Sequence, residues 1–336
     1  MKPLFAGAAD ADLVLANSGM NALYSAFHAV NELQAPRGRT AWVQLGWLYL
    51  DTIAILKKFT ASSTDYIHVP DVLDLGALRR VLAERGPRIA GLVAEVPSNP
   101  LIQTPAVRIL ASLCRRHGVS LILDPSVASA FSVDCFPHAD LIATSLTKYT
   151  GNEGGVLAGL VAVNPAAPDA AELRRAVAAR VEPPYPRDLS RLAAQVGNTE
   201  AVLSRIEEST PKIAAFLTTH PAVRNTYWAL ARDSRENYLR VARSPAAAGG
   251  MISFTLRGSL EGFYDRLRLP KGPSFGMRTT LICPFMYLAH YDLVTSAAGR
   301  DELRANGLDP DLLRLCVGTE PANEIIEALD EALRAS

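Results

Sequence analysis

The chain has 336 residues, of which 49% are hydrophobic and 20% are charged, a composition typical of a soluble globular protein with a large core. Its 34 basic and 34 acidic side chains balance, so charge gives no support to a nucleic acid or an anionic membrane surface as a partner. No apolar run approaches the ~20 residues that a membrane helix needs. The four cysteines are scattered without a CxxC pair, which argues against a zinc site and suits a reducing cytoplasm.

The first part of the chain alternates between short apolar runs and amphipathic segments. Ser18, Gly19 and Met20 precede the first amphipathic segment, and backbone N–H groups at such a helix start attract anions. Taken alone, these residues also fit a plain N-terminal cap. The alternation predicts an α/β fold with a mostly parallel sheet flanked by helices. Strands are expected at residues 40–46, 67–69 and 89–95, a short strand or a helix end at 12–16, and helices at 21–33, 75–85 and 106–117.

The next three apolar runs, residues 119–123, 141–143 and 156–163, also read as buried strands. The first ends at Asp124, and the second is followed by Lys148. In a parallel sheet the strand ends open onto the ligand crevice, so the carboxylate and the amine are expected to meet in one pocket. A buried lysine can lose its proton and form a Schiff base, and a carboxylate facing a pyridine nitrogen keeps that nitrogen protonated. Considered singly, the lysine would be a solvated charge and the aspartate a helix cap.

Six short motifs follow one another along almost the whole chain, and single motifs of this length carry little weight compared with six in one order. Together they resemble the Cys/Met-metabolism family of pyridoxal-phosphate enzymes, which includes cystathionine γ-synthases and γ-lyases of fold type I. The motifs are Ser18-Gly19-Met20, the segment from Glu95 to Pro100, Asp124, the segment from Ser145 to Tyr149, Gly249-Gly250-Met251, and Arg314-Leu315.

The resemblance also implies two domains. In the family a long helix links a large domain to a smaller one, and a helix is expected here over residues 187–216, with breaks at Gly197-Asn198 and at Pro211. We therefore expect a cofactor-binding large domain at residues 1–216 and a smaller α+β domain at residues 217–336.

The resemblance implies a role for each site residue. Lys148 would form the Schiff base with pyridoxal 5'-phosphate and take the proton from the substrate Cα, and Asp124 would pair with the pyridinium nitrogen. Arg314 would bind the substrate α-carboxylate, which suits its bidentate fork. No metal is expected. The remaining expected contacts are Ser18, Gly19, Met20, Ser145 and Thr147 to the phosphate, Ser126 beneath the ring, Asn99 to the ring hydroxyl or the substrate, and Ser274 to the substrate.

Three departures from the family pattern stand out, and one of them is Gly-Asn-Glu-Gly-Gly at residues 151–155, where the family usually has Gly-Gly-His-Ser-Asp. Residues 1–17 carry no counterpart of the Tyr-Ser-Arg motif of the family's N-terminal arm, so we expect this arm to be absent. Leu45 occupies the position of the family's ring-stacking tyrosine, and Trp47 or Tyr49 is the available aromatic substitute, although an aromatic side chain at a strand end is at least as often part of the core.

The resemblance implies an amino-acid substrate and β/γ-elimination or γ-replacement of a sulfur- or oxygen-linked side chain. An aminotransferase or racemase on the same fold is the first alternative, and a degenerate, non-catalytic homologue with a binding role is the second. The substrate side chain and the choice between β and γ chemistry stay open. We expect a cytoplasmic homodimer or homotetramer that binds neither nucleic acid nor membrane.

Overall fold

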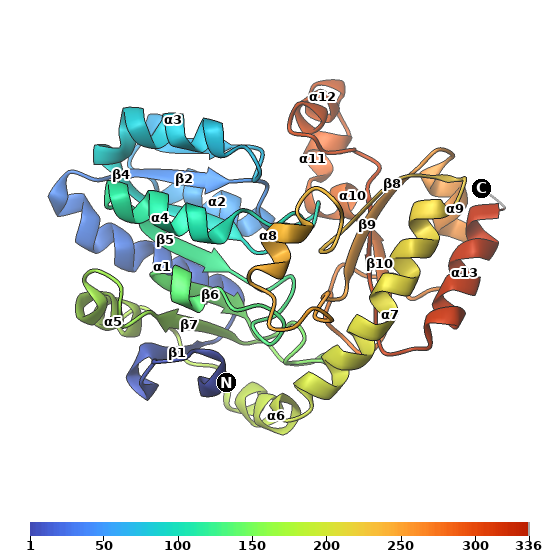
Figure 1. Cartoon of the computed structure of the whole chain (residues 1–336), viewed down its shortest axis with the longest axis horizontal. Coiled ribbons are helices and arrows are strands. Elements are labelled where there is room, and N and C mark those ends of the chain that lie inside the picture. Colours follow the sequence, from blue (N-terminus) through green and yellow to red (C-terminus); the bar gives the residue numbers. More distant parts are fainter. Residues whose placement is uncertain (335–336) are drawn as a thin grey trace.

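The computed structural model describes residues 1–334 and is built around a seven-stranded sheet with strand order β1-β7-β6-β5-β4-β2-β3 (Figure 1). Strands β2 to β6 run parallel, and β7 is antiparallel to both β1 and β6. The expected α/β class with a mostly parallel sheet is confirmed. The strands are β1 (Leu13–Ala16), β2 (Ala41–Leu45), β3 (Tyr66–Val69), β4 (Ile89–Glu95), β5 (Ser120–Asp124), β6 (Leu141–Ser145) and β7 (Gly159–Val163).

Helices cover both faces of this sheet because successive strand residues point to opposite sides. In β2, Trp42 packs into the layer of α1, α2 and α5, whereas Val43 and Leu45 pack into the layer of α3 and α4. Both layers are buried, which explains why the strands read as continuous apolar runs. The helices are α1 (Gly19–Gln34), α2 (Leu50–Phe59), α3 (Leu75–Arg85), α4 (Val107–His117) and α5 (Ala170–Ala178).

The helix expected at 187–216 consists of α6 (Pro186–Val196) and α7 (Thr199–Thr219). The break falls at Gly197-Asn198, as expected. A break at Pro211 was expected as well, and that expectation is wrong, because α7 continues through the proline. Ile206, Ile213 and Leu217 of α7 are fully buried, so tertiary packing outweighs the hydrogen bond that the proline cannot make.

The C-terminal part of the chain forms an antiparallel sheet with the order β10-β11-β9-β8. The helices α7, α9 and α13 contribute buried side chains to the core beside it, and α10 to α12 lie at the other side, facing the large sheet (Figure 1). The proposed domain boundary at 216/217 stays a prediction. The elements are β8 (Val223–Trp228), β9 (Met251–Leu256), β10 (Leu281–Pro284), β11 (Leu313–Cys316), α8 (Arg235–Leu239), α9 (Leu260–Arg266), α10 (Phe285–Ala289), α11 (Tyr291–Val294), α12 (Ala297–Ala305) and α13 (Ala322–Arg334).

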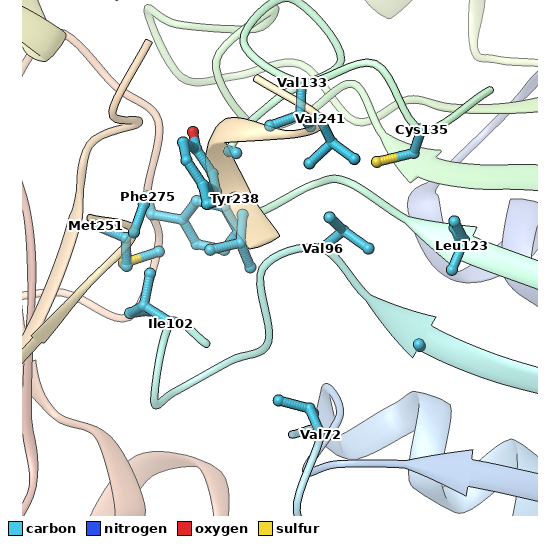
Figure 2. Close-up of a cluster of buried hydrophobic side chains, with 14 of the residues drawn as sticks. Val72, Val96, Ile102, Leu123, Val133, Cys135, Tyr238, Val241, Met251 and Phe275 are labelled. Carbon is cyan, nitrogen blue, oxygen red and sulfur yellow. The ribbon is translucent and has the colours of Figure 1, made fainter. Parts of the chain in front are cut away.

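A shared hydrophobic core joins the two sheets. Figure 2 shows Tyr238 of α8 close to Met251 of β9 and to Phe275, with Ile102 from the β4–α4 loop beneath them. These side chains are all buried. The loops at the ends of the large sheet are therefore held against the small sheet, and the site described below is built from both. Among residues 1–334, no helix is long and apolar enough to span a membrane.

Candidate active site

A cavity of about 430 Å³ lies where β4, β5 and β6 end, beside the start of α1 and the near face of the small sheet. Every residue that the sequence singles out for the site lines it, although their individual roles stay predictions. These residues are Ser18, Gly19, Met20, Asn99, Asp124, Ser126, Ser145, Thr147, Lys148, Ser274 and Arg314.

Lys148 projects into the cavity three residues after the end of β6. Its Nζ donates a hydrogen bond to Ser274 Oγ at 3.0 Å and lies 5.0 Å from the centroid of the Phe275 ring. Burial lowers the pKa of the Lys148 amine, and the charge of Arg314 lowers it further. The amine therefore loses its proton more readily than an exposed lysine, which makes it a stronger nucleophile and base.

The backbone around Lys148 is clamped to the loop that carries Ser274. The N–H of Tyr149 donates to the carbonyl of Gly276 at 2.9 Å. A Cβ on residue 276 would lie 2.3 Å from that same nitrogen, so only glycine permits this approach. The Tyr149 hydroxyl donates to the carbonyl of Val127 at 3.0 Å and accepts the N–H of Gly250 at 3.3 Å. These bonds fix the distance between the lysine and the loop from the small sheet.

Asp124 ends β5 with its carboxylate toward the cavity. The N–H and the Oγ–H of Ser126 donate to Asp124 Oδ1 at 2.8 and 2.5 Å, and Oδ2 receives no hydrogen bond from the described residues. Burial raises the pKa of Asp124 to about 6, and the Ser126 bonds oppose the rise. A protonated ring nitrogen in the cavity would supply the missing donor and positive charge.

Sequence reasoning missed Glu95, the neighbour of Asp124 in the β4–β5 register. Its two carboxylate oxygens accept the N–H of Tyr49 at 2.6 Å and the N–H of Asn99 at 3.0 Å. Burial, together with the charge of Asp124, raises the pKa of Glu95 well above its usual value. Glu95 thus ties two cavity loops to the end of β4. Its place in the Glu-to-Pro motif was visible in the sequence, but its hydrogen-bond partners were not.

Arg314 enters the cavity from β11 and is only 4% exposed. Its guanidinium donates to Asn99 Oδ1 at 3.3 Å and to the carbonyl of Pro273. The same group lies 4.6 Å from the Phe285 ring and 5.4 Å from the Phe275 ring. No acidic side chain of residues 1–334 forms an ion pair with it. A buried, oriented guanidinium without a carboxylate partner suits the carboxylate of a ligand.

The start of α1 forms one corner of the cavity. The Ser18 side chain caps the helix by accepting the N–H of Asn21 at 3.1 Å. A Cβ on Gly19 would lie 2.7 Å from the Ser145 Cβ, so glycine lets the helix start approach the end of β6. The first N–H groups of a helix have no partner within it and carry partial positive charge. Gly19, Met20, Ser145 and Thr147 all border this corner, which suits a phosphate.

The structure also separates the two aromatic side chains that follow β2, of which only Tyr49 lines the cavity. Leu45 is 1% exposed and packs in the core, away from the cavity. Trp47 donates its ring N–H to His290 Nε2 at 2.9 Å. Tyr49 lines the cavity, is 40% exposed, and has its pKa raised by burial and by Asp51. Of the two substitutes considered from the sequence, Tyr49 is therefore the one that faces the site.

Comparison with known proteins agrees with this geometry. A relative from Streptantibioticus cattleyicolor, named L-2-amino-4-chloropent-4-enoate dechlorinase/desaturase, is 42% identical over 97% of this chain and 65% of its own length. Cystathionine gamma-synthase from Neurospora crassa is 31% identical over 97% of this chain and 52% of its own length. The chain thus spans between half and two thirds of these curated relatives.

Solved structures show the same fold. Cystathionine gamma-lyase from Lactobacillus plantarum superposes with a TM-score of 0.81 at 22% identity, covering 99% of this chain and 84% of the other. The family model for Cys/Met metabolism PLP-dependent enzymes matches residues 6–334, in agreement with the motifs read from the sequence. The chain belongs to the Cys/Met metabolism family of pyridoxal-phosphate-dependent enzymes.

Proposed function

We propose that this chain is a pyridoxal-phosphate enzyme that eliminates or replaces a substituent on the γ-carbon of an amino acid. The observation that carries the proposal is the shared cavity of Lys148, Asp124 and Arg314. It combines an amine with a lowered pKa, an acid with one open oxygen, and a guanidinium without a carboxylate partner. A cofactor would offer an aldehyde to Lys148 and a ring nitrogen to Asp124, and an amino acid would offer its carboxylate to Arg314.

The residues present fit the cofactor. Lys148 would bond to its aldehyde carbon, and the open oxygen of Asp124 would accept the ring N–H. Asn99 would contact the ring hydroxyl, and Ser126 would lie beneath the ring. When bound, the cofactor supplies an electron sink for negative charge at the substrate Cα. The amides of the α1 start, with Ser18, Gly19, Met20, Ser145 and Thr147, would hold the phosphate.

The remaining steps belong to the side chains of the chain itself. Arg314 would bind the substrate α-carboxylate, with Asn99 holding the guanidinium in plane. Lys148 would accept the Cα proton of the bound substrate, and its lowered pKa suits a base near neutral pH. Ser274 would orient the amine through the bond it accepts from Nζ. Tyr49 would offer a hydroxyl at the mouth of the site.

The choice of γ-chemistry rests on the relatives. The printed name of the Streptantibioticus cattleyicolor relative describes loss of chlorine from L-2-amino-4-chloropent-4-enoate, whose chlorine is on the γ-carbon. The Neurospora crassa relative is named for the γ-position as well. A leaving group at this position is therefore the substrate feature we propose for this chain.

The first test is the visible spectrum of the protein purified with pyridoxal phosphate, followed by borohydride reduction and peptide mass mapping. We expect a yellow protein whose reduced cofactor maps to Lys148, and a Lys148→Ala variant in which borohydride attaches no cofactor to the chain. A colourless wild-type protein would refute the proposal and favour a non-catalytic binding role.

The second test incubates the yellow protein with γ-chloro and γ-acyloxy amino acids. Release of the leaving group with a keto acid and ammonia, or with a substituted product, is expected. Conversion of the cofactor to its amine form without ammonia would instead identify an aminotransferase, and inversion at Cα alone would identify a racemase. We also propose a cytoplasmic homodimer or homotetramer, which light scattering and cell fractionation measure.

A further inference from the structure

The lining of the cavity includes exposed apolar side chains that the proposed chemistry does not use. Leu157, in the loop before β7, and Leu288, in α10, both line it, and each is 54% exposed. They come from opposite parts of the fold, one beside the large sheet and one beside the small sheet. Exposed leucines on the wall of a cavity lose contact with water when an apolar group covers them. Other apolar side chains that line the cavity include Leu23, Leu50, Phe285 and Ala289.

The charged groups of the cavity are already engaged. Glu95 accepts two backbone N–H groups, and Asp124 and Lys148 have the cofactor positions proposed above. Arg314 then remains as the one cation for a substrate carboxylate. Among residues 1–334, no further acidic or basic side chain lines the cavity. A substrate side chain that ends in a second charged group would therefore place this charge against leucines. The charge would lose its hydration without forming an ion pair.

We propose that this cavity selects amino acids whose side chain ends in an uncharged, apolar group, and that Leu157 and Leu288 form the wall that recognises that group. This inference rests on the proposed function, since it takes the α-carboxylate to be bound at Arg314. The wall favours an alkyl, alkenyl or halogenated end, which covers the two leucines. It disfavours a terminal carboxylate or phosphate, which no lining side chain can neutralise.

The test uses two amino acids of equal length that differ at the tip. L-Norvaline ends in a methyl group where L-glutamate ends in a carboxylate. We expect calorimetric titration of the cofactor-loaded protein to give norvaline a dissociation constant at least about 10-fold lower than glutamate. Calorimetry measures binding without any requirement for turnover.

Matched variants locate the effect. Leu288→Arg adds a cation to the wall and should reduce the preference for norvaline at least about 5-fold. Leu157→Arg introduces the same cation at the other leucine. It provides an independent test in case Leu288→Arg does not fold. Leu239→Arg is the control, because Leu239 is 37% exposed on α8 and lies outside the cavity lining. Leu239→Arg should prefer norvaline to glutamate by the same factor as the wild type.

Equal binding of the two amino acids by the wild type, or tighter binding of glutamate, would overturn the inference. So would an unchanged preference in both wall variants. The proposed function fails separately, if borohydride leaves no cofactor on Lys148 or if γ-substituted amino acids release no product. Failure of both amino acids to bind would reject the inference together with the placement of the α-carboxylate.

Discussion

Replacing Asp124 with asparagine isolates the contribution of its negative charge. The asparagine side chain has almost the same shape, and its amide oxygen can still accept the N–H and Oγ–H of Ser126. The amide nitrogen would face the cavity, where Oδ2 has no donor from the described residues. The variant therefore tests the charge and leaves the packing in place.

The size and sign of the effect on the cofactor-free protein follow from the pKa of Asp124. Burial raises it from 3.8 to about 6, so the folded protein binds the proton more tightly than the unfolded chain. The ionised carboxylate thus lowers the free energy of unfolding above pH 6 and has no such effect below about pH 4. The difference between the two pKa values corresponds to at most about 3 kcal/mol. Without the cofactor at pH 8, the free energy of unfolding of Asp124→Asn should therefore be higher than that of the wild type by up to about 3 kcal/mol.

Bound pyridoxal phosphate should stabilise the wild type more than it stabilises Asp124→Asn. A pyridinium nitrogen beside the ionised carboxylate stabilises the wild type, whereas the neutral amide gains much less. We therefore expect pyridoxal phosphate to raise the free energy of unfolding more for the wild type than for the variant. The variant should also lose about 10²–10³-fold in kcat, the usual effect of removing one preorganised electrostatic partner.

Urea unfolding at pH 8 and near pH 4, each with and without pyridoxal phosphate, measures these differences. Asp140→Asn is the matched control, because burial also raises the pKa of Asp140, and its carboxylate accepts the N–H of Leu121 away from the cavity. Pyridoxal phosphate should raise the free energy of unfolding of Asp140→Asn by as much as that of the wild type. If Asp124→Asn gained as much stability from the cofactor as the wild type, Asp124 would not be the partner of the ring nitrogen.

Three further substitutions test the other parts of the site. Lys148→Ala removes the amine, so mass spectrometry after borohydride treatment should find no attached cofactor, and elimination should slow by at least about 10³-fold. Arg314→Lys loses the bidentate fork, so steady-state kinetics should show kcat/KM about 10²-fold lower, mostly through KM. Tyr149→Phe leaves the Val127 carbonyl and the Gly250 N–H without their buried partner, so urea unfolding should show a loss of about 1–3 kcal/mol.

Each of these predictions has a contrary result. A cofactor still bound covalently to Lys148→Ala would assign the attachment to another residue. An unchanged KM in Arg314→Lys would show that the substrate carboxylate binds elsewhere. For Tyr149→Phe, the control is Tyr291→Phe, whose side chain is 64% exposed. Equal stability of the two tyrosine variants would mean that the Tyr149 hydroxyl does not hold the two sheets together.

The sequence predicted the fold from local patterns, and it predicted the residues that line the cavity mainly from the resemblance of six ordered motifs to the family. Each short apolar run forms a buried strand, and parallel strands bring the residues after their ends to one edge of the sheet. Asp124 and Lys148 meet there for that reason. Ser18, Gly19 and Met20 join them because the α1 start approaches the end of β6, as the glycine at position 19 allows.

Local sequence patterns were less informative about features that depend on tertiary packing. The proline at 211 suggested a helix break, but the buried face of α7 holds the helix together. Trp47 and Tyr49 were equal candidates for the aromatic position, since both follow β2. The bond from the Tyr49 N–H to Glu95, together with the contact between Trp47 and His290, separates their roles. Neither contact leaves a periodic signal in the sequence.

The sequence by itself thus determined the fold class, the family, and the residues that gather at the strand ends. Only the tertiary structure showed the two hydrogen bonds that Glu95 accepts, the lining of the cavity by Tyr49 and not by Trp47, and the presence of Leu157 and Leu288 in the same lining. The physical reason is that periodicity and motifs report on one element at a time. Burial, pKa shifts and the lining of a cavity depend on side chains that are distant in the chain and adjacent only after folding.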